Sequence, residues 1–106
     1  MTTRSLRLAL ALPPGGTEVV AYTTPPSTRT IVKNAVKVAQ AIPTAHYIAI
    51  RSGPMFMYLA TGDLSLNEVV VTDYWSVMEP GDELVVYAAE NGCHFLLSGA
   101  ELPLAT

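Results

Sequence analysis

The chain has 106 residues, the length of one globular domain, and its formal charge of −3 includes no basic run. This charge distribution excludes a surface that follows a nucleic-acid backbone. Only 14% of the residues are charged and 50% are hydrophobic, whereas an average domain has about 25% charged residues. We therefore expect other subunits to cover part of the surface.

Covalent cross-links and membrane segments are not expected. Cys93 is the only cysteine, so the chain forms no internal disulfide, and a cysteine-based zinc site would need ligands from elsewhere. The apolar run Leu8–Leu12 is shorter than a signal peptide requires, and no stretch approaches the roughly 18 apolar residues of a membrane span. We expect a cytoplasmically made, soluble protein with no membrane insertion.

Proline and glycine divide the chain into pieces of strand length. Ser5–Leu12 alternates leucine with arginine or alanine, which predicts an edge strand or arm within residues 1–16. Pro13–Gly16 ends it. Thr17–Thr23 is β-branched and aromatic and predicts a second strand, followed by the loop Thr24–Thr28.

Arg29–Gln40 is ambiguous between helix and strand. Its apolar residues fit a helical face, with Ser27 or Thr28 as a cap. Three valines and an isoleucine favour a strand, with the valines on one side and Lys33 and Lys37 on the other. We expect a strand.

The middle of the chain predicts a hairpin. Ala45–Arg51 places His46, Ile48 and Ile50 on one face, and Ser52–Pro54 turns the chain into Met55–Ala60. Thr61–Asp63 is expected to end that strand, and Leu64–Glu68 to connect it to the next.

Two turn signals organise the last third. Glu79–Asp82 has the proline and glycine of a type II turn, and Asn91-Gly92 is the strongest short hairpin signal. With Val69–Trp75, Leu84–Ala89 and Cys93–Ser98, they predict a three-stranded meander. About eight short strands in residues 1–106 predict an all-β fold, a single antiparallel β-sandwich of jelly-roll character.

Catalytic and metal-binding patterns are absent from the sequence. His46 and His94 lack metal-ligand spacing, and Cys93 and His94 point to opposite faces of a strand. The acidic residues of loops and turns either form turns, the preferred interpretation, or gather as a calcium site. We expect no enzyme activity, no cofactor and no bound metal.

Aromatic residues offer an alternative function. A carbohydrate platform would need two or three exposed, coplanar rings from Tyr58, Tyr74, Trp75 and Tyr87. Tyr74 and Trp75 are the candidate exposed aromatics. A tryptophan that occurs once also commonly fills a core or a subunit contact.

Several segments resemble small virion proteins of tailed bacteriophages. The similarity lies in a Tyr-Thr-x-Pro turn leading into an Ile-Val-Lys strand over Ala21–Asn34, then in Leu64–Glu68, Met78–Leu84 and Leu97–Leu102, in the same order. The chain departs from the pattern in two loops. It has Leu-Asn-Glu68 in place of an Ala-Gly-Glu-Thr-like turn, and Pro26-Ser27 in place of a glycine.

The resemblance implies a β-sandwich subunit of a phage particle, made in a bacterial cytoplasm and placed in the tail or adsorption apparatus. It implies a homo-oligomer, with a trimer favoured, that contacts other virion proteins, and a host-surface glycan is a further candidate partner. Capsid decoration or a head fibre, and a carbohydrate-binding module, are the alternatives. The candidate contact residues lie in the loops Thr23–Thr28 and Gly62–Glu68, and are Thr24, Pro25, Pro26, Ser27, Asp63, Leu64 and Asn67.

Overall fold

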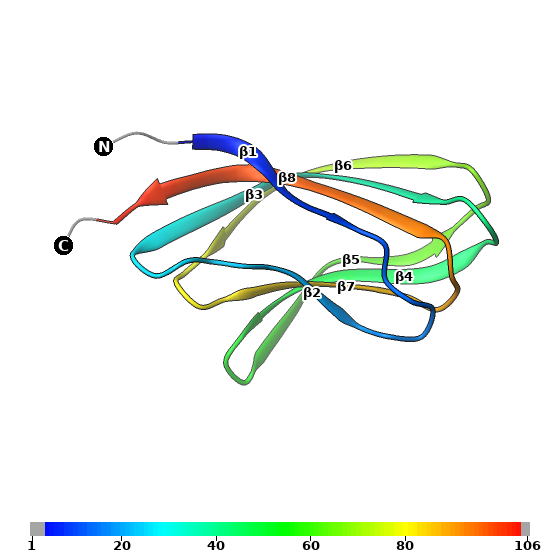
Figure 1. The fold of residues 1–106 in the computed structure, drawn as a ribbon, viewed down its shortest axis with the longest axis horizontal. Helices are drawn as coiled ribbons and strands as arrows, with labels where there is room; N and C mark the ends of the chain where they lie inside the picture. The colour runs from blue at the N-terminus through cyan, green and yellow to red at the C-terminus, as the bar shows by residue number, and fades with distance from the viewer. Residues whose placement is uncertain (1–3, 105–106) are drawn as a thin grey trace.

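Two four-stranded antiparallel sheets form the protein in the computed structural model, which describes residues 4–104 (Figure 1). In chain order the strands are β1 (Arg4–Ala11), β2 (Val19–Thr23), β3 (Thr28–Ala39), β4 (Thr44–Ser52), β5 (Met55–Leu64), β6 (Val69–Met78), β7 (Glu83–Ala88) and β8 (Cys93–Pro103). The first sheet has the order β1-β8-β3-β6 and the second β2-β7-β4-β5. The predicted all-β sandwich is confirmed, and the strand interpretation of residues 29–40 is correct.

The strands arise from one long hairpin that is folded over on itself. β4 and β5 are joined by a turn at Gly53, and further ladders pair β3 with β6, β2 with β7 and β1 with β8. The partner's residue number rises as the residue number falls, from Thr44 opposite Leu64 to Arg4 opposite Glu101. Two more ladders, β3 with β8 and β4 with β7, assemble the sheets.

The core lies between the two sheets and is built from one face of each strand. Phe95 and Leu97 of β8 face Ile48 of β4 and Leu84 of β7 across the layer, and all four side chains are fully buried. Burying each such side chain stabilises the fold by about 1.5–3 kcal/mol before packing losses are counted. The predicted inward face of β4, with His46, Ile48 and Ile50, is confirmed.

The predicted meander over β6, β7 and β8 is wrong. β6 and β8 both belong to the first sheet, where β3 lies between them, whereas β7 lies between β2 and β4 in the second. Both turns exist: the backbone N–H of Asp82 donates to the carbonyl of Glu79 at 3.0 Å, and Gly81 and Gly92 have φ of 87° and 85°. Each turn carries the chain from one sheet to the other.

The Asn91-Gly92 turn contacts neighbouring loops instead of closing a hairpin. The side-chain oxygen of Asn91 accepts a hydrogen bond from the backbone N–H of Gly15 at 2.8 Å, and the carbonyl of Gly92 accepts one from Gln40 at 2.9 Å. A Cβ at Gly92 would lie against the Cβ of Ala41. The Asn-Gly pair explains why the chain turns here. The contacts with Gly15 and Gln40 explain why it turns into the other sheet and not into a hairpin.

A β-bulge changes which residues of β3 face the core. The register shifts between Val32 and Asn34 in both ladders of β3. Val32 points inward, but beyond the bulge Ala35, Lys37 and Ala39 are the buried residues. The prediction that the valines share one side opposite Lys37 is therefore wrong.

Three other expectations need correction. A bulge between Arg7 and Ala9 breaks the leucine alternation of β1, so Leu8, Ala9 and Ala11 pack against the core while Leu10 is exposed. β5 runs on to Leu64 and does not end at Ala60, and β8 is also longer than predicted. Residues 1–3 of the predicted arm lie outside the described residues.

The close approach of β8 to β3 requires glycine at position 99. A Cβ there would fall on the carbonyl oxygen of Ile31 and would lie 3.1 Å from Cδ1 of Leu8. We expect Gly99→Ala to destabilise the protein by more than about 3 kcal/mol, because the obstructing atom is backbone. Chemical unfolding measures this, with Ser98→Ala as the control; equal stability of the two variants would contradict the assignment.

Candidate functional site

The outer face of the first sheet is apolar and is not covered by any other described element. One row of directly opposed residues crosses all four strands, running from Leu10 through Leu96 and Val36 to Val71. Leu10 is 64% exposed and Val71 is 59% exposed. We call the following residues the outer apolar face: Leu10, Val36, Val69, Val71, Trp75, Val77 and Leu96.

The strand β6 is more apolar on its exposed side than on its core side. Val69, Val71, Trp75 and Val77 point outward, whereas the core side carries Thr72, Tyr74 and Ser76 among its five residues. A strand of a monomer normally has the opposite distribution. An exposed apolar stripe on an edge strand marks a contact with another molecule.

A polar row crosses the same outer face, from Arg7 through Ser98 and Asn34 to Asp73. The ammonium of Lys33 lies 5.6 Å above the ring of Trp75, and Asn34 donates to Asp73 at 2.9 Å. Arg29 and Glu79 form an exposed ion pair at 2.9 Å, which contributes little to stability. Asp73 thus separates Val69 and Val71 from Trp75 and Val77 on β6, so the outer apolar face has two parts.

The outer face of the second sheet is different, because its own side chains cover it. Tyr47 and Tyr87 stack with ring centroids 4.9 Å apart, and Phe56 and Tyr58 pack edge-on against Tyr47 at 6.0 and 5.3 Å. Val85 lies on this outer face and is nevertheless completely buried. The aromatic layer thus closes the face.

Ion pairs fix the aromatic layer. Arg51 donates to Glu18 and to Glu83, each at 2.8 Å, and the hydroxyl of Tyr47 donates to the other oxygen of Glu18. The bond from Tyr47 is the largest of the effects that lower the pKa of Glu18, while burial and this carboxylate raise the pKa of Tyr47. The charged and hydroxyl groups of Glu18, Tyr47, Arg51 and Glu83 therefore have their partners within the chain.

The predicted contact loops lie at opposite ends of the sandwich, so the structure does not bring them together (Figure 1). Thr24 is buried, because its backbone pairs with Gly81 and Asp82 of the β6–β7 turn. Leu64 is buried in the core. Pro25 is half-buried, and the exposed members are Pro26, Ser27, Asp63 and Asn67.

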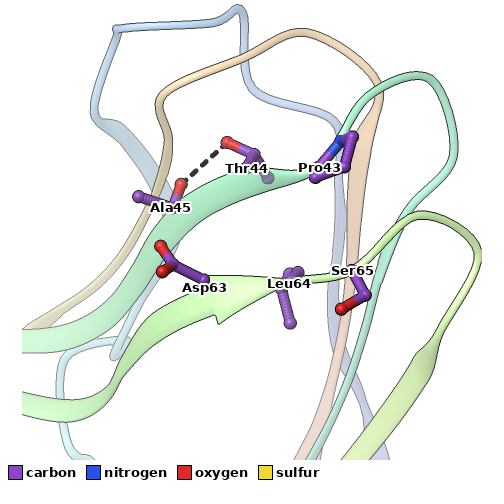
Figure 2. A pocket seen from close by; sticks show the side chains of 6 residues that line it. All are labelled: Pro43, Thr44, Ala45, Asp63, Leu64 and Ser65. Carbon is purple, nitrogen blue, oxygen red and sulfur yellow. Dashed lines mark hydrogen bonds between the residues drawn. The ribbon is translucent and has the colours of Figure 1, made fainter.

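A shallow hollow of about 310 Å³ lies beside the second loop (Figure 2). Its lining residues are Pro43, Thr44, Ala45, Asp63, Leu64 and Ser65. The hydroxyl of Thr44 donates to the carbonyl of Ala45 at 2.8 Å and accepts from the backbone N–H of Glu90 at 2.9 Å. The lining has one carboxylate and no histidine or cysteine, so it offers no acid–base pair.

The candidate exposed aromatics lie on opposite faces of β6. Trp75 is 71% exposed, whereas Tyr74 is half-buried, points inward and packs against the core. On the second sheet, the rings of Phe56 and Tyr58 meet at 77°. The described residues therefore form no platform of coplanar, exposed rings.

Two ionisable side chains inside the sandwich were missed as a site by sequence reasoning. Lys37 is 4% exposed and lies directly opposite Phe95 in the β3–β8 ladder. Cys93 is the neighbouring inward-facing residue of β8, two positions from Phe95. The ring of His46 faces Phe95 from the second sheet, with centroids 6.1 Å apart. Without the bulge, which the sequence did not reveal, Lys37 would point to solvent.

Burial controls the ionisation of this cluster. It lowers the pKa of Lys37 and raises the pKa of the Cys93 thiol to about 11, so the thiol is protonated and unreactive at neutral pH. Nδ1 of His46 lies 2.8 Å from the carbonyl of Gly62, and Nε2 has no hydrogen-bond partner among residues 4–104. Cys93 and His94 do lie on opposite faces of β8, as predicted.

Residues 4–104 contain neither a group of metal-ligating side chains placed to hold an ion nor a helix long and apolar enough to cross a membrane.

No family model and no curated protein matches the chain. Two crystal structures of a pentameric capsid protein isolated from metagenomic phage sequences are similar to it, with 15% and 13% identity and TM-scores of 0.45 and 0.39. The similarity covers 95% of this chain but 61% and 62% of those chains, so the chain spans about three fifths of their length. A similarity of this size assigns no family and no role.

Removal of the buried charge at position 37 should stabilise the protein. We expect Lys37→Met to raise the free energy of unfolding at pH 7 by about 1–3 kcal/mol, because methionine keeps the stem and removes the buried ammonium. The wild type should gain stability as the pH rises toward the ordinary lysine pKa of 10.5, where both states lose the charge. Urea unfolding at pH 7 and pH 9.5 tests both points. A less stable Lys37→Met variant at pH 7 would show that the ammonium has a partner.

His46 should make stability depend on mildly acidic pH. Its pKa is lowered by burial and by the charge of Lys37, while the Gly62 carbonyl and Asp63 act in the other direction. The unfolded chain therefore takes up this proton first, so stability is full above about pH 6.5 and falls as the pH drops below it. We expect His46→Gln to reduce the loss between pH 7.5 and 5.5 and His94→Gln to retain it. An unchanged pH dependence in His46→Gln would contradict this.

Proposed function

We propose that this chain is a non-enzymatic structural subunit of a tailed-bacteriophage particle, placed in the tail or adsorption apparatus. It works as a symmetric homo-oligomer, with a trimer as the favoured form. The subunits contact one another through the apolar face of the sandwich and through strand edges. In this role the chain acts by packing against other subunits and catalyses no reaction.

The observation that carries the proposal is the outer apolar face. Its exposed members include Leu10, Val71 and Trp75, on strands at both edges of the first sheet. A monomer that exposed this face would bury it by association, since apolar surface contributes about 25 cal/mol per Å² when it leaves water. The outer face of the second sheet does not require such cover.

Two further points support the structural role. The order β1-β8-β3-β6 facing β2-β7-β4-β5 is that of a jelly roll, an architecture of viral capsid proteins and also of lectins and cupins. The sequence resemblance to small virion proteins includes the turns before β3 and β7. These turns set the sandwich and carry no chemistry of their own.

Capsid decoration or a head-fibre role is the alternative within the same class, since the same apolar face would serve there. A carbohydrate-binding role is supported by the exposure of Trp75 alone. Titration with glycans while the tryptophan fluorescence is recorded separates the structural role from the carbohydrate-binding role. Only a carbohydrate-binding module should show a shift in the fluorescence of Trp75.

The oligomer tests the proposal directly. We expect sedimentation of the purified full chain at micromolar concentration to give a closed oligomer without any ligand. Val71→Lys should weaken association about tenfold or more, because it places a charge within the outer apolar face. The fold should survive, since residue 71 is exposed.

Gln40→Lys is the matched control, because it adds the same charge in an exposed segment outside the outer apolar face. Its oligomer should match the wild type. A wild-type chain that sediments as a monomer would overturn the structural role as proposed.

A further inference from the structure

The sandwich has four edge strands, which expose unpaired backbone N–H and C=O groups: β1 and β6 in the first sheet, and β2 and β5 in the second. Natural proteins protect such edges with charge, proline, bulges or short length. Charge at mid-strand or short length protects three of the four edges. β5 is the exception.

Charges at mid-strand protect β1 and β6 from pairing with their own copies. In an antiparallel pair related by a two-fold axis, residues near the middle of a strand face the same residues of the second copy. Arg7 lies in the middle of β1 and Asp73 in the middle of β6, so self-pairing would bring like charges together. β2 is only five residues long and is interrupted by a bulge.

β5 is protected only by a bulge at Leu59, where its register against β4 shifts. It carries no charged residue from Met55 to Gly62, and no proline. Its first four side chains are all apolar or aromatic and all exposed: Met55, Phe56, Met57 and Tyr58. β5 is therefore the edge at which a second copy can pair without placing like charges opposite one another.

A pocket of about 230 Å³ opens beside this edge, and its lining is mostly apolar but includes Ser52 and Asp82. Met55, Met57 and Ile50 line it from the β4–β5 hairpin, and Val77 lines it from the end of β6. Directly opposed residues in an antiparallel pair lie on the same side of the sheet. A second copy's Met57 would thus lie at the mouth of the pocket, and methionine adapts well to irregular apolar spaces.

We propose that β5 pairs antiparallel with β5 of a second copy, about a two-fold axis near Met57, so that the two second sheets become one eight-stranded sheet. This inference rests on the proposed function, which requires an oligomer, and it names a contact separate from the outer apolar face. The occupant is a second copy because the uncharged edge is complementary to itself. With the outer apolar face, each subunit then has two different contact surfaces.

Cysteine cross-linking tests the pairing. The native Cys93 is buried and forms no intermolecular bridge, so the wild type is the blank. We expect Met57→Cys to form a disulfide-linked dimer under mild oxidation, because the two copies of residue 57 face each other across the axis. Thr61→Cys is the matched control; it is exposed on the same strand, four residues from the axis, and should stay unlinked. Equal cross-linking of both variants, or none in Met57→Cys, would overturn the proposal.

Met57→Lys distinguishes this contact from the outer apolar face. It should halve the mass of the wild-type assembly while circular dichroism and thermal unfolding remain unchanged. An assembly that Val71→Lys dissociates but Met57→Lys leaves intact would overturn the β5 pairing and leave the structural role standing. A monomeric wild type would overturn both. If β5 instead takes an extended segment of another protein, the pure chain shows no Met57→Cys dimer, and the pairing is again overturned.

Discussion

A single bulge in β3 decides both what the first sheet buries and what it exposes. Between Val32 and Asn34 the register shifts against both β6 and β8, so every side chain of β3 beyond this point changes face. The shift moves Val36 to the outer surface and Lys37 into the core. The apolar outer face and the buried ammonium therefore have one cause. The register shift that adds Val36 to the contact surface also requires the free-energy cost of burying Lys37.

Local patterns predicted the strands well but predicted their partners poorly. Alternation located strand segments, and Ser52–Pro54 correctly marked the one tight hairpin between paired consecutive strands. Asn91-Gly92 failed as a hairpin signal because turn residues determine backbone angles, whereas sheet membership depends on which faces must be buried. The bulges in β1 and β3 escaped prediction for a related reason. An extra residue in a strand is recognised only against its partner's register.

The loops named from the sequence and the surfaces found in the structure are different parts of the molecule. Sequence reasoning favoured loops because turns expose polar backbone, yet Thr24 and Leu64 are buried by contacts with segments distant in the chain. The outer apolar face left only a partial signal in β6: Thr72 and Ser76 are more polar than Val71 and Val77, but Val70 and Asp73 break the alternation. Alternation alone does not say which face is inside. In the second sheet the aromatic layer covers the outer face, and no comparable layer from residues 4–104 covers the first sheet.

The nested pairing of the strands also has a consequence for synthesis. The hairpin of β4 and β5 brings together residues close in sequence, and each later ladder joins segments farther apart, up to Arg4 with Glu101. Contacts of such long range form slowly, because loop closure precedes any gain from pairing. Of the eight strands, β1 is synthesised first, and its ladder partner among residues 4–104, β8, is synthesised last. Until β8 has been made, this leucine-rich strand has no place in a sheet.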